Sequence, residues 1–149
     1  MDVVKTVKTG LWAVLGVLSS WLGVLAIPVY VLVGCNVMDY ITGLLAANRR
    51  GQKISSYTGI NGIAKKVCMW LLIAVGGVLD WLIGYAGAAL GMTVPLPMAA
   101  AMLTAVWLIV NEVISILENV KDLGVPLPGF LGKLAALVKS KTDSSSLAK

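Results

Sequence analysis

The chain has 149 residues, of which 58% are hydrophobic and 13% are charged, and its formal net charge is +5. Soluble domains are about half apolar and a quarter charged, so this composition excludes an ordinary soluble domain and indicates a membrane protein. With no histidine and two cysteines, the chain has too few ligands for a metal site. It also lacks a phosphate-binding glycine loop and a nucleophile beside a base, so neither an enzyme nor a cofactor is expected.

The first long apolar stretch runs from Gly10 to Ala47 and is interrupted only by Asp39. A membrane-spanning helix needs about 20 residues. The stretch is therefore long enough for two spans, or for one span and an interfacial helix. Because proline breaks helices, Pro28 offers a natural division, and Gly23 and Pro28 bracket a possible turn. We predict spans at about 9–26 and 28–47.

Two further apolar stretches follow, Val67 to Leu90, which contains Asp80, and Met98 to about Leu117. Each is long enough to cross a bilayer once, which places spans at about 66–90 and 98–119. The predicted fold is an all-α membrane protein, a bundle of three to four transmembrane helices.

The C-terminal region, residues 120–149, reads as a basic tail that follows the transmembrane domain of residues 1–119. Pro126 and Pro128 break the chain after the last span. From Phe130 to Val138 the apolar residues recur at helical spacing, which predicts a short amphipathic helix that lies on the inner leaflet or on a partner.

The positions of the basic residues predict the orientation in the membrane. The segment 48–66 contains no acid and five basic residues: Arg49, Arg50, Lys53, Lys65 and Lys66. Short loops rich in lysine and arginine stay in the cytoplasm, so this segment and the basic tail are expected inside. Four spans then place both chain ends in the cytoplasm, together with Lys5 and Lys8. Those two lysines and the apolar run after them also resemble a cleavable signal peptide, which stays an alternative for the N-terminus.

Asp39 is the first of two acids within the spans, roughly 12 Å inside the cytoplasmic end of its helix. A carboxylate at this depth needs a charged partner or water. Lys65 and Lys66 begin the next span and are the nearest cations expected. Asp39 either forms a buried ion pair that holds the fold, or lines an aqueous lesion or controls assembly.

Asp80 lies deeper, roughly 20 Å from the cytoplasmic edge, where no lysine or arginine of this chain reaches easily. Burial disfavours the charged form of a carboxyl group. Asp80 is therefore expected either as a neutral acid held by hydrogen bonds, or as a group that faces a pore or a neighbouring subunit.

The last predicted span ends in the polar sequence NEVISILEN. Helical spacing gives it two overlapping polar faces, one with Asn111, Ser115 and Glu118 and the other with Glu112, Ser115 and Asn119. These faces are candidates for contact with the first intramembrane acid or with the lysine pair, or for hydrogen bonds between helices.

Three motifs carry a family resemblance: MDYITG at 38–43, GINGIAKKV at 59–67 and NEVISILENVKDLGVPLP at 111–128. In this order and spacing, the segment from about Val37 to Leu137 resembles the toxin-secretion and phage-lysis holin family. The last motif is long and the most specific of the three.

The resemblance implies a bacteriophage or clostridial type of holin in the bacterial inner membrane. Such proteins form homo-oligomers that open lesions in the membrane and trigger host-cell lysis. Its expected partners are other copies of itself, membrane lipids, an endolysin or secreted toxin and, in regulated systems, an antiholin. Two alternatives stay open: a small proton-coupled transporter or ion channel that uses Asp39 or Asp80, and an antiholin. Nucleic-acid binding is not expected.

Overall fold

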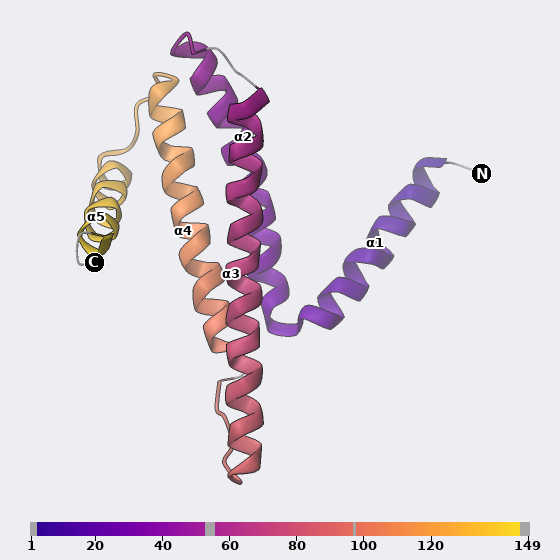
Figure 1. The fold of residues 1–149 in the computed structure, drawn as a ribbon. Helices are drawn as coiled ribbons and strands as arrows, with labels where there is room; N and C mark the ends of the chain where they lie inside the picture. The colour runs from indigo at the N-terminus through magenta and orange to yellow at the C-terminus, as the bar shows by residue number, and fades with distance from the viewer. Residues whose placement is uncertain (1–2, 53–55, 97, 147–149) are drawn as a thin grey trace. The chain divides into compact units, whose positions relative to one another are not determined.

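A computed structural model describes residues 3–52, 56–96 and 98–146 (Figure 1). Over these residues the protein consists of helices and their connections, with no strand, which confirms the all-α prediction. The helical elements are α1 (Val3–Leu22), the short 3-10 helix η1 (Gly23–Leu25), α2 (Ala26–Arg49), α3 (Ser56–Ala89), α4 (Ala99–Asp122) and α5 (Gly129–Ser146). Helix α5 extends past Val138, where the amphipathic pattern of the sequence ends.

Within the described part of the chain, three helical stretches are long and apolar enough to cross a membrane: Val3–Arg49, Gly62–Ala89 and Ala99–Asp122. In the most apolar segment of each stretch, the share that is buried within the single chain is only 11% to 22%. Large apolar side chains therefore face outward, as expected for a protein whose solvent is lipid. The number of crossings made by the first stretch stays a prediction.

The first stretch is divided at Gly23, five residues before Pro28. Gly23 has a φ of +54°, a left-handed conformation that glycine adopts at little steric cost. Pro28 lies in the first turn of α2, where a missing N–H group is tolerated. The chain therefore turns at residues 23–25, within the turn expected between Gly23 and Pro28, and the left-handed residue is Gly23.

The connection between α2 and α3 is shorter than the predicted loop of residues 48–66. Helix α2 continues to Arg49, and α3 already begins at Ser56. No proline lies between Ser56 and Lys66. Once a helix has nucleated, each further residue adds a hydrogen bond, so the polar residues before the predicted span are helical as well.

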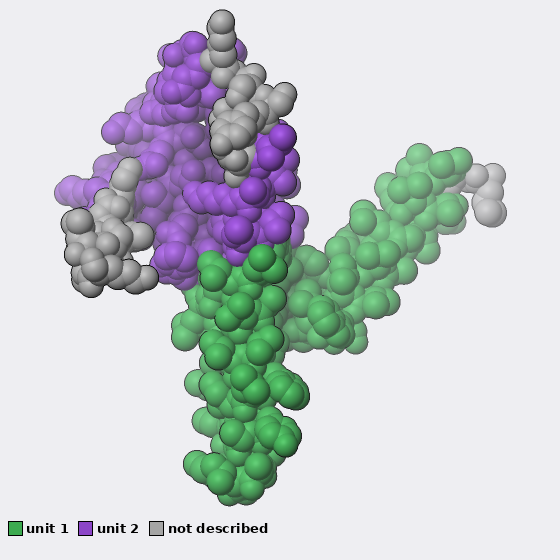
Figure 2. Space-filling view, viewed as in Figure 1, with its two compact units in different colours: residues 1–31, 70–106 green, residues 32–69, 107–149 purple. Residues whose placement is uncertain are grey.

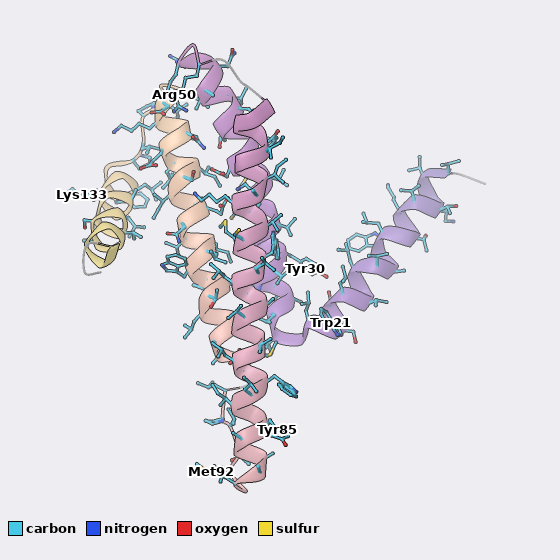
Figure 3. The ribbon with its side chains drawn as sticks, in the orientation of Figure 1. Trp21, Tyr30, Arg50, Tyr85, Met92 and Lys133 are labelled. Carbon is cyan, nitrogen blue, oxygen red and sulfur yellow. The ribbon has the colours of Figure 1, made fainter. Side chains whose placement is uncertain are left out.

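The structure contains two compact units (Figure 2): residues Met1–Val31 with Trp70–Val106, and residues Leu32–Met69 with Trp107–Lys149. In the first unit, Tyr30 connects the start of α2 to α1 (Figure 3). Its hydroxyl group donates a hydrogen bond of 2.9 Å to the carbonyl oxygen of Leu15, and it lies 2.9 Å from the hydroxyl of Ser19.

The first unit also contains a close approach between α3 and α4. A Cβ atom added to Gly76 would lie 2.8 Å from the Cα atom of Ala101, whereas one added to Gly77 would meet no atom within 4 Å. Ala101 is fully buried. Small residues let membrane helices approach this closely, and of the two adjacent glycines Gly76 is the one at the contact.

Candidate functional site

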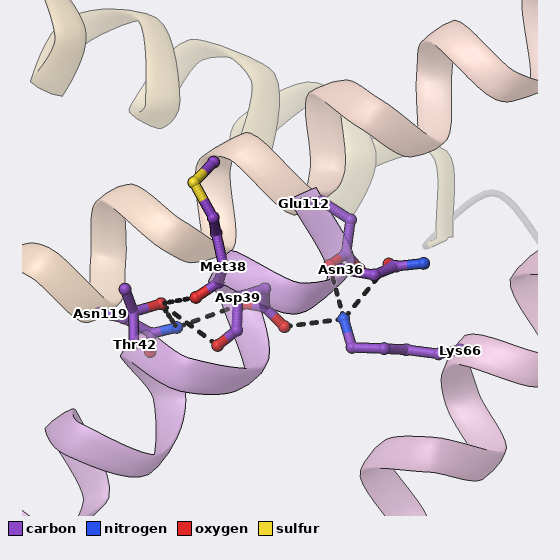
Figure 4. Close-up of polar contacts among 7 residues, drawn as sticks. All are labelled: Asn36, Met38, Asp39, Thr42, Lys66, Glu112 and Asn119. Carbon is purple, nitrogen blue, oxygen red and sulfur yellow. Dashed lines mark hydrogen bonds and ion pairs between the residues drawn. The ribbon is translucent and has the colours of Figure 1, made fainter. Parts of the chain in front are cut away.

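Lys66 lies at the centre of a charged cluster in the second unit (Figure 4). Its ammonium nitrogen is 2.6 Å from Glu112 Oε2, 3.0 Å from Asp39 Oδ2 and 3.4 Å from Asn36 Oδ1. An ammonium group has three hydrogens to donate, and each has an acceptor here. Because Asp39 belongs to α2, Lys66 to α3 and Glu112 to α4, this one side chain connects three helices.

The second carboxylate oxygen of Asp39 also accepts a hydrogen bond. Asn119 of α4 donates from Nδ2 to Asp39 Oδ1 and to Thr42 Oγ1, both at 3.2 Å. The hydroxyl of Thr42 donates to the carbonyl oxygen of Met38 at 2.8 Å. We call the residues joined through their side chains, Asn36, Asp39, Thr42, Lys66, Glu112 and Asn119, the Lys66 cluster.

The Lys66 cluster is largely buried and carries unequal charge. The side chain of Glu112 is 5% exposed, and those of Lys66 and Asp39 are each 18% exposed. With both carboxyl groups ionised, two negative charges face one positive charge. Removing an ion from water costs several kcal/mol unless pairing and hydrogen bonds offset it. The stability of this arrangement therefore depends on Lys66.

A cavity of about 490 Å³ lies beside the cluster. Asp39, Lys66 and Glu112 line it, together with Ser115 and with Gln52, which follows the end of α2. The cavity thus reaches from the cluster to the basic end of α2, which gives water or an ion space beside the buried charges.

The two arginines at the end of α2 hold that end against the end of α4. Arg50 forms an ion pair with Asp122. The guanidinium of Arg49 lies so close to Gly124 that a Cβ atom there would be 2.9 Å from Nη2. Cations are favourable near the C-terminus of a helix. The C-terminal ends of α2 and α4 are therefore side by side, and Lys53, the third predicted topology determinant, lies outside the described residues.

Asp80 does not join the cluster, and it belongs to the first unit. Its two carboxyl oxygens accept hydrogen bonds from the backbone N–H groups of Ala100 at 2.9 Å and Ala101 at 2.8 Å. The first N–H groups of a helix have no partner within the helix and favour a negative group. Asp80 on α3 therefore caps the start of α4: it is held by hydrogen bonds, which was one of the two expectations, but both its oxygens act as acceptors of backbone N–H groups.

Replacing Asp80 with alanine is expected to lower stability by about 1–2 kcal/mol, the usual cost of losing a helix cap. Asp80→Asn keeps one acceptor oxygen and should lose less. Thermal unfolding in detergent, followed by circular dichroism, measures both changes. An unchanged melting temperature for Asp80→Ala would mean that the cap contributes nothing to stability.

The remaining predicted residues occupy different places. Ser115 lines the cavity of the cluster, and Lys65 lines it from an exposed position. Asn111 is half-buried on α4. Glu118 lines a second cavity between α4 and α5. Within the described residues, the ion pairs to Asp39 and Glu112 come from Lys66 and not from Lys65.

Two cluster members, Asn36 and Thr42, were not among the predicted site residues. They stand three residues before and three residues after Asp39, which places all three on one face of a helix. That spacing was a usable signal. A separate signal concerned the cap that Asp80 provides. No Ser, Thr, Asp or Asn stands directly before α4, so the N-terminus of α4 has no cap from its own sequence.

The comparison with protein families identifies the chain. A sequence model described as the bacteriophage holin family matches residues 16–140. The chain belongs to the bacteriophage holin family. This confirms the resemblance seen in the three motifs and makes the protein a holin-type membrane protein, of a family without enzymatic activity.

The holin also has relatives among bacterial proteins. It is 34% identical over 128 residues to an uncharacterized protein of Halalkalibacterium halodurans, covering 85% of this chain and 90% of the relative. It is 33% identical over 130 residues to an uncharacterized protein of Clostridium perfringens, covering 87% and 88%. A third uncharacterized relative, from Listeria innocua, is 32% identical over 135 residues, covering 91% and 88%. No solved structure matches the chain.

Proposed function

We propose that this holin assembles with copies of itself in the bacterial inner membrane and opens lesions through which an endolysin or a toxin leaves the cytoplasm. The Lys66 cluster is the observation that supports this function. In the single chain, Asp39, Lys66 and Glu112 face one another, although each belongs to a long apolar helix. The chain thus keeps these charges away from lipid while it holds polar groups that could line water.

The charge imbalance of the cluster gives a physical reason for a second, assembled state. A buried carboxylate without its own cation is costly, and water around it removes most of that cost. Ionisable residues within membrane helices mark water-filled paths. In a lesion, Asp39, Lys66 and Glu112 would face water instead of one another, and the apolar sides of the helices would still face lipid.

We infer the orientation from the basic end of α2 and α4. Arg49 and Arg50 lie at this end beside Gly124 and Asp122, and lysine and arginine near short loops stay on the cytoplasmic side. If α1 also crosses the membrane, both ends of the chain are cytoplasmic.

The test is expression of the holin in a bacterium with and without an endolysin, with optical density and dye uptake recorded. Lesion formation predicts dye uptake in both cultures and a fall in optical density only with endolysin. A selective transporter or channel would not release endolysin. No dye uptake at high membrane abundance would contradict the proposal and favour an antiholin.

Asp39→Asn is expected to delay lysis. The substitution leaves one acidic side chain opposite Lys66, so the cluster becomes neutral, and the introduced amide still offers one acceptor oxygen. Removing an uncompensated buried charge should stabilise the resting chain by about 1–3 kcal/mol. The time at which optical density falls, compared at equal membrane abundance, measures the effect.

Asp122→Asn is the matched control, because Asp122 is half-exposed and pairs with Arg50 outside the cluster. It should leave the time of lysis nearly unchanged. If Asp39→Asn also left the timing unchanged, the cluster would have a structural role only.

A further inference from the structure

Helix α5 carries two apolar faces, and the protein covers only one of them. The half-buried face contains Leu131, Ala135 and Val138. The other face contains Phe130, Leu134 and Leu137, whose exposed fractions are 70%, 55% and 59%. Each set has the spacing i, i+4 and i+7, so each forms a continuous stripe along the helix. We call Phe130, Leu134 and Leu137 the outer stripe.

The side of α5 that faces α4 is built from small residues. Gly132, Ala135 and Ala136 line a cavity of about 210 Å³ together with Leu117, Glu118 and Lys121 of α4. Figure 3 shows Lys133 on α5, in the same unit as the end of α4. The bulky residues of the outer stripe are therefore turned away from the helix that α5 packs against, whereas a soluble helical protein would bury such a stripe.

The connection to α4 keeps α5 near the membrane. Helix α4 ends at Asp122, which pairs with Arg50, and α5 begins at Gly129. The residues between, 123–128, can extend at most about 20 Å. The chain turns at Gly124, with a φ of +84°, and Leu131 donates its backbone N–H to the carbonyl oxygen of Pro128. Helix α5 therefore stays close to the basic end of α2 and α4.

The charge around the outer stripe matches an anionic surface. Lys133 is exposed at the edge of the stripe, and Arg49, Arg50 and Lys121 lie at the same end of the unit. Basic groups beside an apolar helix face bind anionic lipid headgroups while the apolar residues enter the acyl boundary.

The acids whose side chains the structure describes offer little for a basic helix of a second copy to meet. Asp39 and Glu112 bind Lys66, Asp80 caps α4, and Asp122 pairs with Arg50. Glu118 is exposed, and it lines the cavity beside α5 of its own chain, next to Lys121. Charge complementarity therefore favours lipid over another copy of the protein.

We propose that α5 binds the anionic surface of the membrane at the basic end of α2 and α4, with Phe130, Leu134 and Leu137 inserted at the acyl boundary and Lys133 at the headgroup phosphates. The binding holds α5 parallel to the bilayer, and it depends on anionic lipid as well as on the outer stripe.

The test uses the full chain in vesicles, with Cys35→Ala and Cys68→Ala removing the native thiols. A fluorescent label is attached at Leu134→Cys, and in a separate protein at Ser140→Cys, an exposed polar position of the same helix. Vesicles are made from phosphatidylcholine alone or with one third phosphatidylglycerol. Nitroxide-labelled lipid reports contact with the bilayer, and acrylamide reports contact with water.

We expect the label at position 134 to be quenched by nitroxide lipid about twofold more in anionic than in neutral vesicles, and the label at position 140 to be quenched by acrylamide in both. Lys133→Glu should abolish the anionic preference at position 134. A label at Leu137→Cys should give the same result as the label at position 134, which would show that the result does not depend on one labelled position. Equal acrylamide quenching at positions 134 and 140 in anionic vesicles would overturn the proposal. Protection of position 134 from both quenchers would also overturn it, because a second copy would then cover the stripe.

Discussion

Lys66→Met is expected to destabilise this holin by about 3–5 kcal/mol, the usual cost of removing one partner from a buried ion pair. The variant would leave Asp39 and Glu112 facing each other in a buried site without a cation. Because α2, α3 and α4 all contribute to the cluster, the loss should spread over three helices. Thermal unfolding in detergent and protein abundance in membranes both measure it.

Lys65→Met is the matched control, since Lys65 is the adjacent residue and is exposed. It should change stability by no more than about 0.5 kcal/mol. Adding Asp39→Asn and Glu112→Gln to Lys66→Met makes the cluster uncharged and should restore most of the lost stability. If Lys66→Met unfolded at the same temperature as the native protein, the cluster would not stabilise the chain.

Gly76→Ala is expected to cost about 3 kcal/mol, at the upper end of the range for overpacking. The new methyl group would meet the backbone of α4 at Ala101 within 2.8 Å. Backbone atoms cannot change rotamer to make room, so α3 and α4 would have to separate, which would also strain the cap that Asp80 provides to α4. The melting temperature in detergent should fall accordingly.

Gly77→Ala adds the same methyl group one residue later, where no atom lies within 4 Å. Alanine is favoured over glycine within a helix by about 0.5–1 kcal/mol. Gly77→Ala should therefore be neutral or slightly stabilising. The comparison separates helix propensity from packing, and equal effects of the two substitutions would contradict the close contact at Gly76.

Sequence patterns could predict that Asp39 needs a partner, because a carboxylate within an apolar helix is costly. They could also indicate that this partner is one of the two lysines, Lys65 or Lys66. They could not choose between Lys65 and Lys66, which are adjacent and differ by about 100° around the helix. That choice depends on the rotation of α3 relative to α2, which is set by packing.

The missing cap residue before α4 indicated that its N-terminus needs an acceptor from elsewhere, but residue types could not show that Asp80 supplies it, because the partners of Asp80 are backbone N–H groups. Every residue except proline has such a group, so the sequence does not mark it. Likewise, Gly76 and Gly77 look equivalent in sequence, and only the position of Ala101 distinguishes them. The break at Gly23 depends on one left-handed residue, which outweighs the more visible Pro28.

The three hydrogen bonds of the Lys66 ammonium have a consequence for how the helices can separate. Asn36 and Asp39 hold it from α2, and Glu112 holds it from α4. If α2 or α4 moves away, Lys66 stays paired with one carboxylate, whereas the departure of α3 leaves Asp39 and Glu112 together without a cation. Loss of α3 therefore costs more than loss of α2 or of α4, because two buried carboxylates would remain unpaired. The Lys66 ammonium thus makes α3 the helix to which α2 and α4 are both attached.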